Sequence, residues 1–208
     1  MDIKHTFKVE VSSDKSSGFS LVELVIVAGI LVMITGTMLV NYSSFNSSII
    51  LGSLAYDIAL SIRQAQVFGL SVRAYKGGSG PATFDTGYGV HFEAPLPTKS
   101  YILFADTDRD FNYNALLDGD IDVFTIGRGN FISEFCTTNS SDVERCASTA
   151  DITKLDIVFG RPDPEAIIKT DYVPPEVYGS VRIVVSSPQG NERVIRVFST
   201  GQITVESP

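Results

Sequence analysis

Hydrophobic residues form one long run near the start of the chain. A polar segment covers residues 1–18, and from Phe19 to Val40 the residues are apolar or small except for Glu23, the only charged residue between Gly18 and Asp57. As an α-helix, this stretch of 22 residues would be about 33 Å long, enough to cross the hydrocarbon core of a bilayer. The pattern therefore predicts a membrane-spanning helix that begins close to residue 19.

A second hydrophobic pattern follows, in which apolar residues recur at spacings of three and four. Such a stripe predicts an amphipathic helix that packs on a core. Because no proline occurs before Pro81, we expect one nearly continuous helix over residues 20–74, ended by the Gly- and Pro-containing segment 76–81. The Ser- and Asn-rich residues 41–48 leave a kink or local melting as the alternative. The stripe consists of Leu51, Leu54, Ile58, Ile62, Ala65, Phe68 and Val72.

Beyond Pro81 the pattern changes to a period of two, which is typical of half-buried strands. The segments 187–191 and 200–201 have the composition of hairpin connections between the last three strands. We therefore expect an antiparallel sheet packed against the amphipathic half of the helix, which is an α+β head. The expected strands are Tyr88–Phe92, Ser100–Ala105, Asp122–Ile126, Lys154–Phe159, Ser180–Ser186, Glu192–Ser199 and Gln202–Val205.

Composition argues against catalysis and against nonspecific nucleic-acid binding. The formal net charge is −8, and it is unchanged without residues 1–18, which hold equal numbers of acids and lysines. His5 and His91 are the only histidines, so a histidine-rich metal site is excluded and a Ser-His-Asp triad is disfavoured. We expect a non-enzyme that requires no cofactor. His91 lies in an alternating segment, which predicts a strand residue on the solvent face.

Gly18, Phe19 and Glu23 form a motif at the boundary between the polar segment and the apolar run. A carboxylate at the head of a membrane-length helix is costly to bury, and it usually marks a functional partner. Two plainer interpretations are an ordinary secretory signal and a simple N-terminal anchor. The first would carry a small-residue cleavage site after the apolar stretch. The second gives no reason for Glu23.

The motif resembles the N-terminus of type IV pilins and type II secretion pseudopilins. The resemblance implies a pilin fold and cleavage after Gly18 by a membrane-embedded prepilin peptidase, which also methylates the new amine of Phe19. It implies that Glu23 pairs with the N-terminal charge of a neighbouring subunit during assembly. The implied partners are other pilin subunits, the peptidase, an inner-membrane assembly platform and membrane lipid. The implied location is the cytoplasmic membrane, with the head outside the cytoplasm, followed by a surface or periplasmic filament.

The remainder of the chain is most similar to the minor pseudopilin GspH and the FimT-type minor pilins. The likeness rests on residues 62–66, on residues 104–106 before an acidic loop, and on residues 193–197 with 201–203. Some FimT-type pilins bind DNA through a C-terminal Gly-Arg-x-Arg motif. Here the corresponding residues are Gly201-Gln202-Ile203-Thr204, without either arginine. Nucleic acid is therefore not an expected partner.

Acidic and amide residues alternate after the second expected strand. Alternate oxygens on a tight loop can converge on a hard cation, as in the first half of an EF-hand loop. Phe111, however, stands where that loop needs a glycine, and Leu117 stands where it needs a bidentate acid. A structural Ca²⁺ site and a solvated Asx-rich turn are both consistent with this pattern. The candidate ligands are Asp106, Asp108, Asp110, Asn112, Asp118 and Asp120.

Cys136 and Cys146 are the only cysteines, and they flank the polar segment 137–145. In a head outside the cytoplasm, such a close pair is expected to form a disulfide, with two free thiols as the alternative. The Pro-rich segment 161–175 is expected to be a long surface loop.

Together these patterns predict four segments. Residues 1–18 form a removable leader, 19–45 a transmembrane and filament-core helix, 46–76 the amphipathic half of the helix, and 77–208 a β-rich head. The leading expectation is a minor subunit of a type IV pilus-like filament. A minor pseudopilin of a type II secretion system and a DNA-uptake or adhesive minor pilin are the alternatives.

Overall fold

The computed structural model describes residues 18–71, 74–76 and 84–207. Two compact units divide the chain, residues 1–43 and residues 44–208. The expected leader, apart from Gly18, lies outside the described residues. The two units are described separately below.

Helix α1 spans Leu21–Leu70 and contributes to both units. Residues 41–48 are helical throughout. The segment therefore does not melt locally, and the helix is continuous as expected. Within the first unit, residues Leu21–Leu39 have a mean hydropathy of 2.3 and are long and apolar enough to cross a membrane. Within this unit their large side chains are all exposed, and even the least exposed of them, Val27, is 52% exposed.

The helix ends at Leu70, earlier than the expected residue 74. The Ser71 hydroxyl donates a hydrogen bond to the Phe68 carbonyl, which satisfies one of the last carbonyls of the helix. A Cβ at Gly69 would lie 2.3 Å from the Phe159 backbone carbonyl oxygen, so the last turn of the helix packs closely against residue 159.

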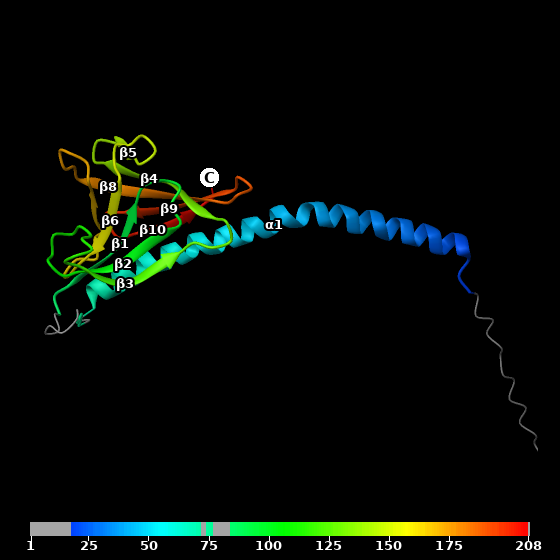
Figure 1. Ribbon diagram of the computed structural model, residues 1–208, viewed down its shortest axis with the longest axis horizontal. Helices are drawn as coiled ribbons and strands as arrows, with labels where there is room; N and C mark the ends of the chain where they lie inside the picture. The colour runs from blue at the N-terminus through cyan, green and yellow to red at the C-terminus, as the bar shows by residue number, and fades with distance from the viewer. Residues whose placement is uncertain (1–17, 72–73, 77–83, 208) are drawn as a thin grey trace, which may run out of the picture. The chain divides into compact units, whose positions relative to one another are not determined.

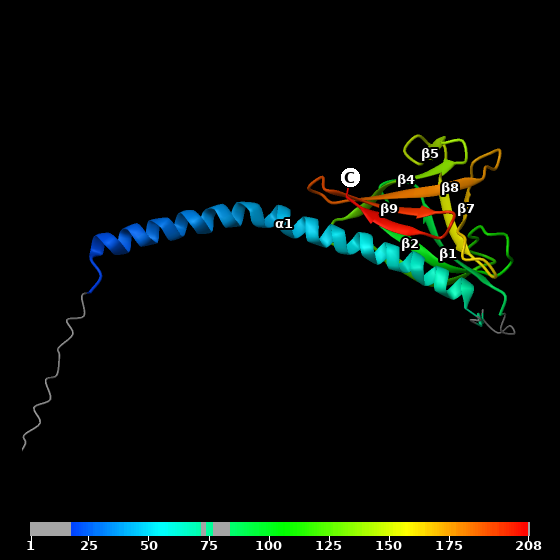
Figure 2. The ribbon, with the colours of Figure 1, turned by 180° about the vertical axis from the view of Figure 1, so that it is seen from behind.

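The second unit contains two five-stranded sheets, and every paired neighbour is antiparallel (Figures 1 and 2). The first sheet has the order β3-β2-β1-β6-β7 and the second the order β10-β9-β8-β4-β5. The bounds are β1 Gly87–Glu93, β2 Ser100–Asp106, β3 Gly119–Thr125, β4 Phe131–Asn139, β5 Glu144–Cys146, β6 Lys154–Phe159, β7 Ile167–Thr170, β8 Tyr178–Ser186, β9 Glu192–Phe198 and β10 Ile203–Glu206.

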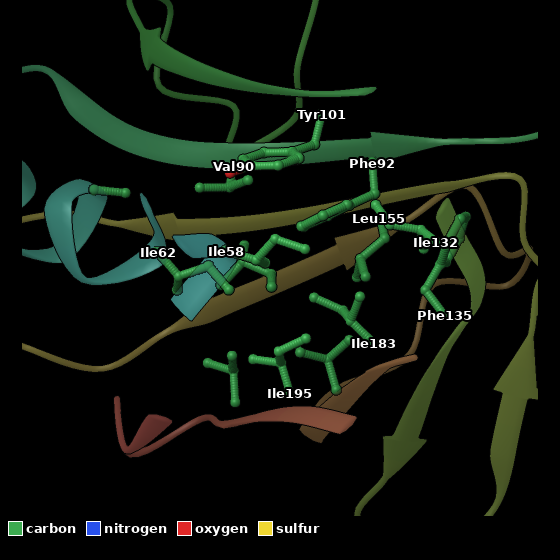
Figure 3. Close-up of a cluster of buried hydrophobic side chains, with 14 of the residues drawn as sticks. Ile58, Ile62, Val90, Phe92, Tyr101, Ile132, Phe135, Leu155, Ile183 and Ile195 are labelled. Carbon is green, nitrogen blue, oxygen red and sulfur yellow. The ribbon is translucent and has the colours of Figure 1, made fainter. Parts of the chain in front are cut away.

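One hydrophobic core joins the helix to both sheets (Figure 3). Ile58 and Ile62 of α1 are fully buried, and they point toward Val90 of the first sheet and Ile195 of the second. The expected apolar stripe is confirmed, because Leu51, Ala65 and these two isoleucines are all buried while Leu54 and Phe68 are partly buried. Val72 lies outside the described residues. The fold is thus α+β, as predicted.

Polar bonds fix this helix on the head in addition to the apolar contacts. Gln66 donates hydrogen bonds to the carbonyls of Pro164 and Gly201, at 3.1 and 3.2 Å. The Ser61 and Tyr101 hydroxyls lie 3.0 Å apart. Burial raises the pKa of Tyr101 to about 12, so the phenol stays protonated and keeps this bond at physiological pH.

All seven expected strands are present within a few residues of their predicted ends, but three strands were missed. The polar segment 137–145 begins in β4 and ends in β5, which pair as a hairpin. The segment 161–175, expected to be a loop, contains β7, which pairs with β6. The sequences of β5 and β7 are short and show no clear period-two alternation. Their strand structure depends on a neighbouring strand.

Candidate functional site

The N-terminal motif occupies the start of α1. Phe19 is 78% exposed, and Glu23 lies in the first turn of the helix. A carboxylate at this position interacts favourably with the helix dipole, because the first turn carries a partial positive charge. The Leu24 amide donates to the Ser20 carbonyl at 3.1 Å, so helical hydrogen bonding begins right after Phe19.

Contacts among the described residues do not explain the glycines of this segment. A Cβ at Gly18, Gly29 or Gly36 would meet none of those residues within 4 Å. Glycine weakens a helix interior by up to about 1 kcal/mol relative to alanine. Gly29 and Gly36 are seven residues apart and therefore lie on one face of α1. A close approach of another helix, or an enzyme that reads Gly18, would supply the missing reason.

The helix in the second unit also carries a second apolar row, on the face opposite the core. Ile49, Tyr56, Leu60 and Val67 are each 55–64% exposed. Their separations of seven, four and seven residues place them on one face. On one flank, a groove of about 430 Å³ is lined by Ile49, Leu54, Asp57, Ile126, Arg128 and Asn130.

The acidic loop between β2 and β3 brings three of the six candidate ligands together. One carboxylate oxygen from each of Asp106, Asp108 and Asp118 lies within 4.8 Å of the others. Asp110 and Asp120 lie outside this group. Asp110 accepts the Asn112 amide at 2.8 Å, and Asp120 accepts the Tyr113 hydroxyl at 2.8 Å.

Backbone amides of the same loop hold two of these carboxylates in place. Asp106 accepts from the amides of Arg109 at 2.8 Å and Phe111 at 3.2 Å. Asp118 accepts from the amides of Thr107 at 2.9 Å and Asn114 at 2.8 Å. Phe111 has φ 62°, so it adopts the left-handed bend for which an EF-hand loop uses glycine.

Burial sets the charge of this group. Asp106 is fully buried, and its desolvation raises the pKa to about 6, against the hydrogen bonds that lower it. Desolvation also raises the pKa of Asp118, and repulsion from Asp108 and Asp110 adds to that increase. A divalent cation would offset the negative charge of the three carboxylates and favour the ionised form of Asp106 and Asp118. The Asx-type hydrogen bonds show that the loop is also ordered by its own backbone. A structural Ca²⁺ site and a solvated Asx-rich turn are therefore both consistent with this geometry.

Cys136 and Cys146 form a disulfide, as expected. They lie directly opposite each other in the pairing of β4 with β5. Arg145, next to this bond, pairs with Glu176 at 3.1 Å and stacks over the Tyr172 ring at 4.2 Å from its centroid. The disulfide hairpin thus supports the connection between β7 and β8.

His91 is buried, which corrects its expected place on the solvent face. Its side chain is 2% exposed although it lies on the face of β1 that points away from the core. The ring of Tyr113, from the acidic loop, covers it at a centroid distance of 4.5 Å. A loop more than 20 residues further along the chain makes this contact, so the alternating pattern of β1 gave no sign of it.

No protein-family model, no curated protein and no solved structure matches this chain. The candidate function therefore rests on the residues and geometry given above.

Proposed function

We propose that this chain is a membrane-anchored filament subunit of the type IV pilin and pseudopilin class. It is cleaved after Gly18 and methylated on the amine of Phe19. The observation that carries the proposal is the motif Gly18-Phe19 with Glu23 at the start of the apolar segment Leu21–Leu39. A secretory signal or a simple anchor accounts for the apolar segment but not for Glu23.

The exposed surfaces of α1 support a role in assembly. The large side chains of the segment Leu21–Leu39 are exposed within the first unit, so lipid would cover them before assembly and other subunits after it. Gly29 and Gly36 allow helices to approach closely on one face. Contacts between non-identical surfaces of successive subunits generate an open helical filament rather than a closed ring.

Glu23 has a specific part in this proposal. Its carboxylate pairs with the methylated amine of Phe19 in a neighbouring subunit, since a carboxylate in apolar surroundings is tolerated when it is paired with a cation. The pairing fixes the axial register between subunits. Lys4, Lys8 and Lys15 agree with a cytoplasmic N-terminus, which places the head outside the cytoplasm.

The head is proposed to be a non-catalytic domain of the pilin fold. Its α+β architecture, with an amphipathic helix packed on antiparallel sheets, is compatible with that fold. The disulfide suits a location outside the cytoplasm, where thiols are oxidised. The assembly platform, the peptidase and other pilin subunits are the proposed partners, and a net charge of −8 speaks against nucleic acid.

The test is expression with a prepilin peptidase, followed by fractionation of membranes and sheared fibres. Glu23→Gln should leave cleavage after Gly18 intact and reduce incorporation into fibres. Asp57→Asn is the matched control, because it removes the next acid on the same helix and should assemble normally. Normal incorporation of the Glu23 variant would contradict the proposed register role.

A second measurement, of secreted enzymes and surface fibres in cells with and without this chain, separates a pilus subunit from a secretion-system pseudopilin. Dependence of secreted enzymes on this chain, without surface fibres, would favour the pseudopilin. Surface fibres that contain this chain would favour the pilus.

A further inference from the structure

His91 presents a buried ring nitrogen that has no hydrogen-bond partner among the residues that the structure describes. Its Nε2 atom is inaccessible to solvent and unpaired, while the side chain as a whole is 2% exposed. A buried polar atom without a partner destabilises the folded state, so such an atom calls for an explanation. This atom belongs to no part of the filament proposal.

Asp156 determines which nitrogen of His91 carries the proton in the neutral ring. His91 Nδ1 lies 2.6 Å from Asp156 Oδ1, and the two residues are direct partners in the pairing of β1 with β6. Asp156 is also buried. With Nδ1 as the donor to this carboxylate, Nε2 is the ring nitrogen that holds the lone pair whenever the ring is neutral.

The lone pair of Nε2 faces a second carboxylate. Glu93 Oε2 lies 3.7 Å from Nε2, and Glu93 is about half exposed. Two acceptors that face each other need a positive charge between them. At 3.7 Å the gap is too long for a hydrogen bond. Two metal bonds of about 2.0–2.1 Å each span up to about 4.1 Å, so a metal ion fits this gap.

Both potential ligands have the supporting partners that metal ligands usually have. His91 donates its other N–H to Asp156, and Glu93 uses its second oxygen, Oε1, to bind Lys154 Nζ at 3.3 Å. Outer partners of this kind orient a histidine and a carboxylate toward an ion. A cavity of about 200 Å³ borders the pair, and it leaves room for water ligands beside the Ser100 side chain.

We propose that His91 Nε2 and Glu93 Oε2 bind a divalent cation of borderline softness, with Zn²⁺ as the representative ion. Imidazole selects zinc, copper and nickel over calcium and magnesium, which prefer oxygen. The site is therefore distinct in chemistry from the acidic loop. Two protein ligands leave two tetrahedral positions for water, which predicts weaker binding than in a closed four-ligand zinc site. The inference is independent of the proposed filament function.

The sequence allows a clean spectroscopic test. His5 is the only other histidine, and both cysteines are oxidised in the disulfide. In a His5→Asn background of the full chain in detergent micelles, His91 is the only imidazole. Two-bond ¹H–¹⁵N correlation spectra of the ¹⁵N-labelled ring then report each nitrogen separately. Zn²⁺ titrated into chelator-treated protein should shift the His91 Nε2 resonance and leave Nδ1 protonated.

Glu93→Gln is the decisive variant, because Glu93 is half exposed and its change leaves the core intact. It should weaken the zinc response of His91 by about tenfold or more. Glu165→Gln removes the same charge from an exposed position elsewhere and should leave the response unchanged. An Nε2 chemical shift that does not change in millimolar Zn²⁺ would overturn the proposal. So would equal zinc affinity in the Glu93 variant, or a doubly protonated ring that keeps its Nε2 proton in zinc.

Discussion

The buried carboxyl group of Asp106 gives the head an unusual dependence on pH. Its pKa is raised by burial from 3.8 to about 6, although two backbone amides donate to it. Between these two values the folded state binds more protons than the unfolded state, so the free energy of unfolding falls as the pH rises. The group costs the folded state nothing below pH 3.8, and its full cost is reached above about pH 6.

The size of the effect follows from the same two values. A difference of one pKa unit corresponds to 1.36 kcal/mol, so the change from 3.8 to about 6 corresponds to about 3 kcal/mol of lost stability. Asp106→Asn removes the ionisation but keeps an oxygen that accepts a backbone amide. The free energy of unfolding of the native protein, relative to this variant, should therefore fall by about 3 kcal/mol between pH 4 and pH 7.

The assay is urea unfolding in the presence of a chelator, followed by circular dichroism because the chain has no tryptophan. Native protein and Asp106→Asn are measured in parallel at several pH values. The difference between them cancels the other titrating groups. A difference that stays constant from pH 4 to pH 7, or that grows in favour of the native protein, would refute the reasoning.

Three further predictions concern the acidic loop, the disulfide and a glycine. Millimolar Ca²⁺ should raise the unfolding temperature more at pH 7.5 than at pH 5. Asp108→Asn should remove most of this increase, whereas the control Asp163→Asn should keep it. An equal increase in both variants would contradict a Ca²⁺ site in the acidic loop. Changing both Cys136 and Cys146 to serine should lower the free energy of unfolding by about 3 kcal/mol. An unchanged free energy of unfolding in urea would contradict a stabilising role of the disulfide. Gly201→Ala should cost about 2 kcal/mol or more in the same assay, because φ is 82° and a Cβ would collide with the Pro164 carbonyl; an unchanged midpoint would show that the turn adapts.

Local patterns were sufficient to predict much of this structure. The stripe that includes Ile58 and Ile62 gave both the second half of the helix and the face that is buried. Alternation gave seven strands, including β6 with both of its ends. The spacing of the two cysteines gave the disulfide. Each of these features depends on residues close together in the sequence.

The features that sequence did not predict depend on contacts between distant residues. His91 is buried because Tyr113 folds over it, and its pairing with Asp156 requires the register of β1 with β6. Likewise, alternation suggested six oxygen ligands in the acidic loop, and of the five carboxylates among them the turns of the backbone bring Asp106, Asp108 and Asp118 into one group. Strand β7 forms because β6 offers it a partner.

The identity of the mature N-terminus tests the central proposal most directly. The chain would be purified from membranes of cells that hold a prepilin peptidase and measured intact by mass spectrometry. The proposal predicts a chain that begins at Phe19 and carries a methyl group on its amine. A chain that begins at Met1, or one that is cut beyond the apolar segment near residue 40, would contradict the assignment of Gly18, Phe19 and Glu23 to filament assembly.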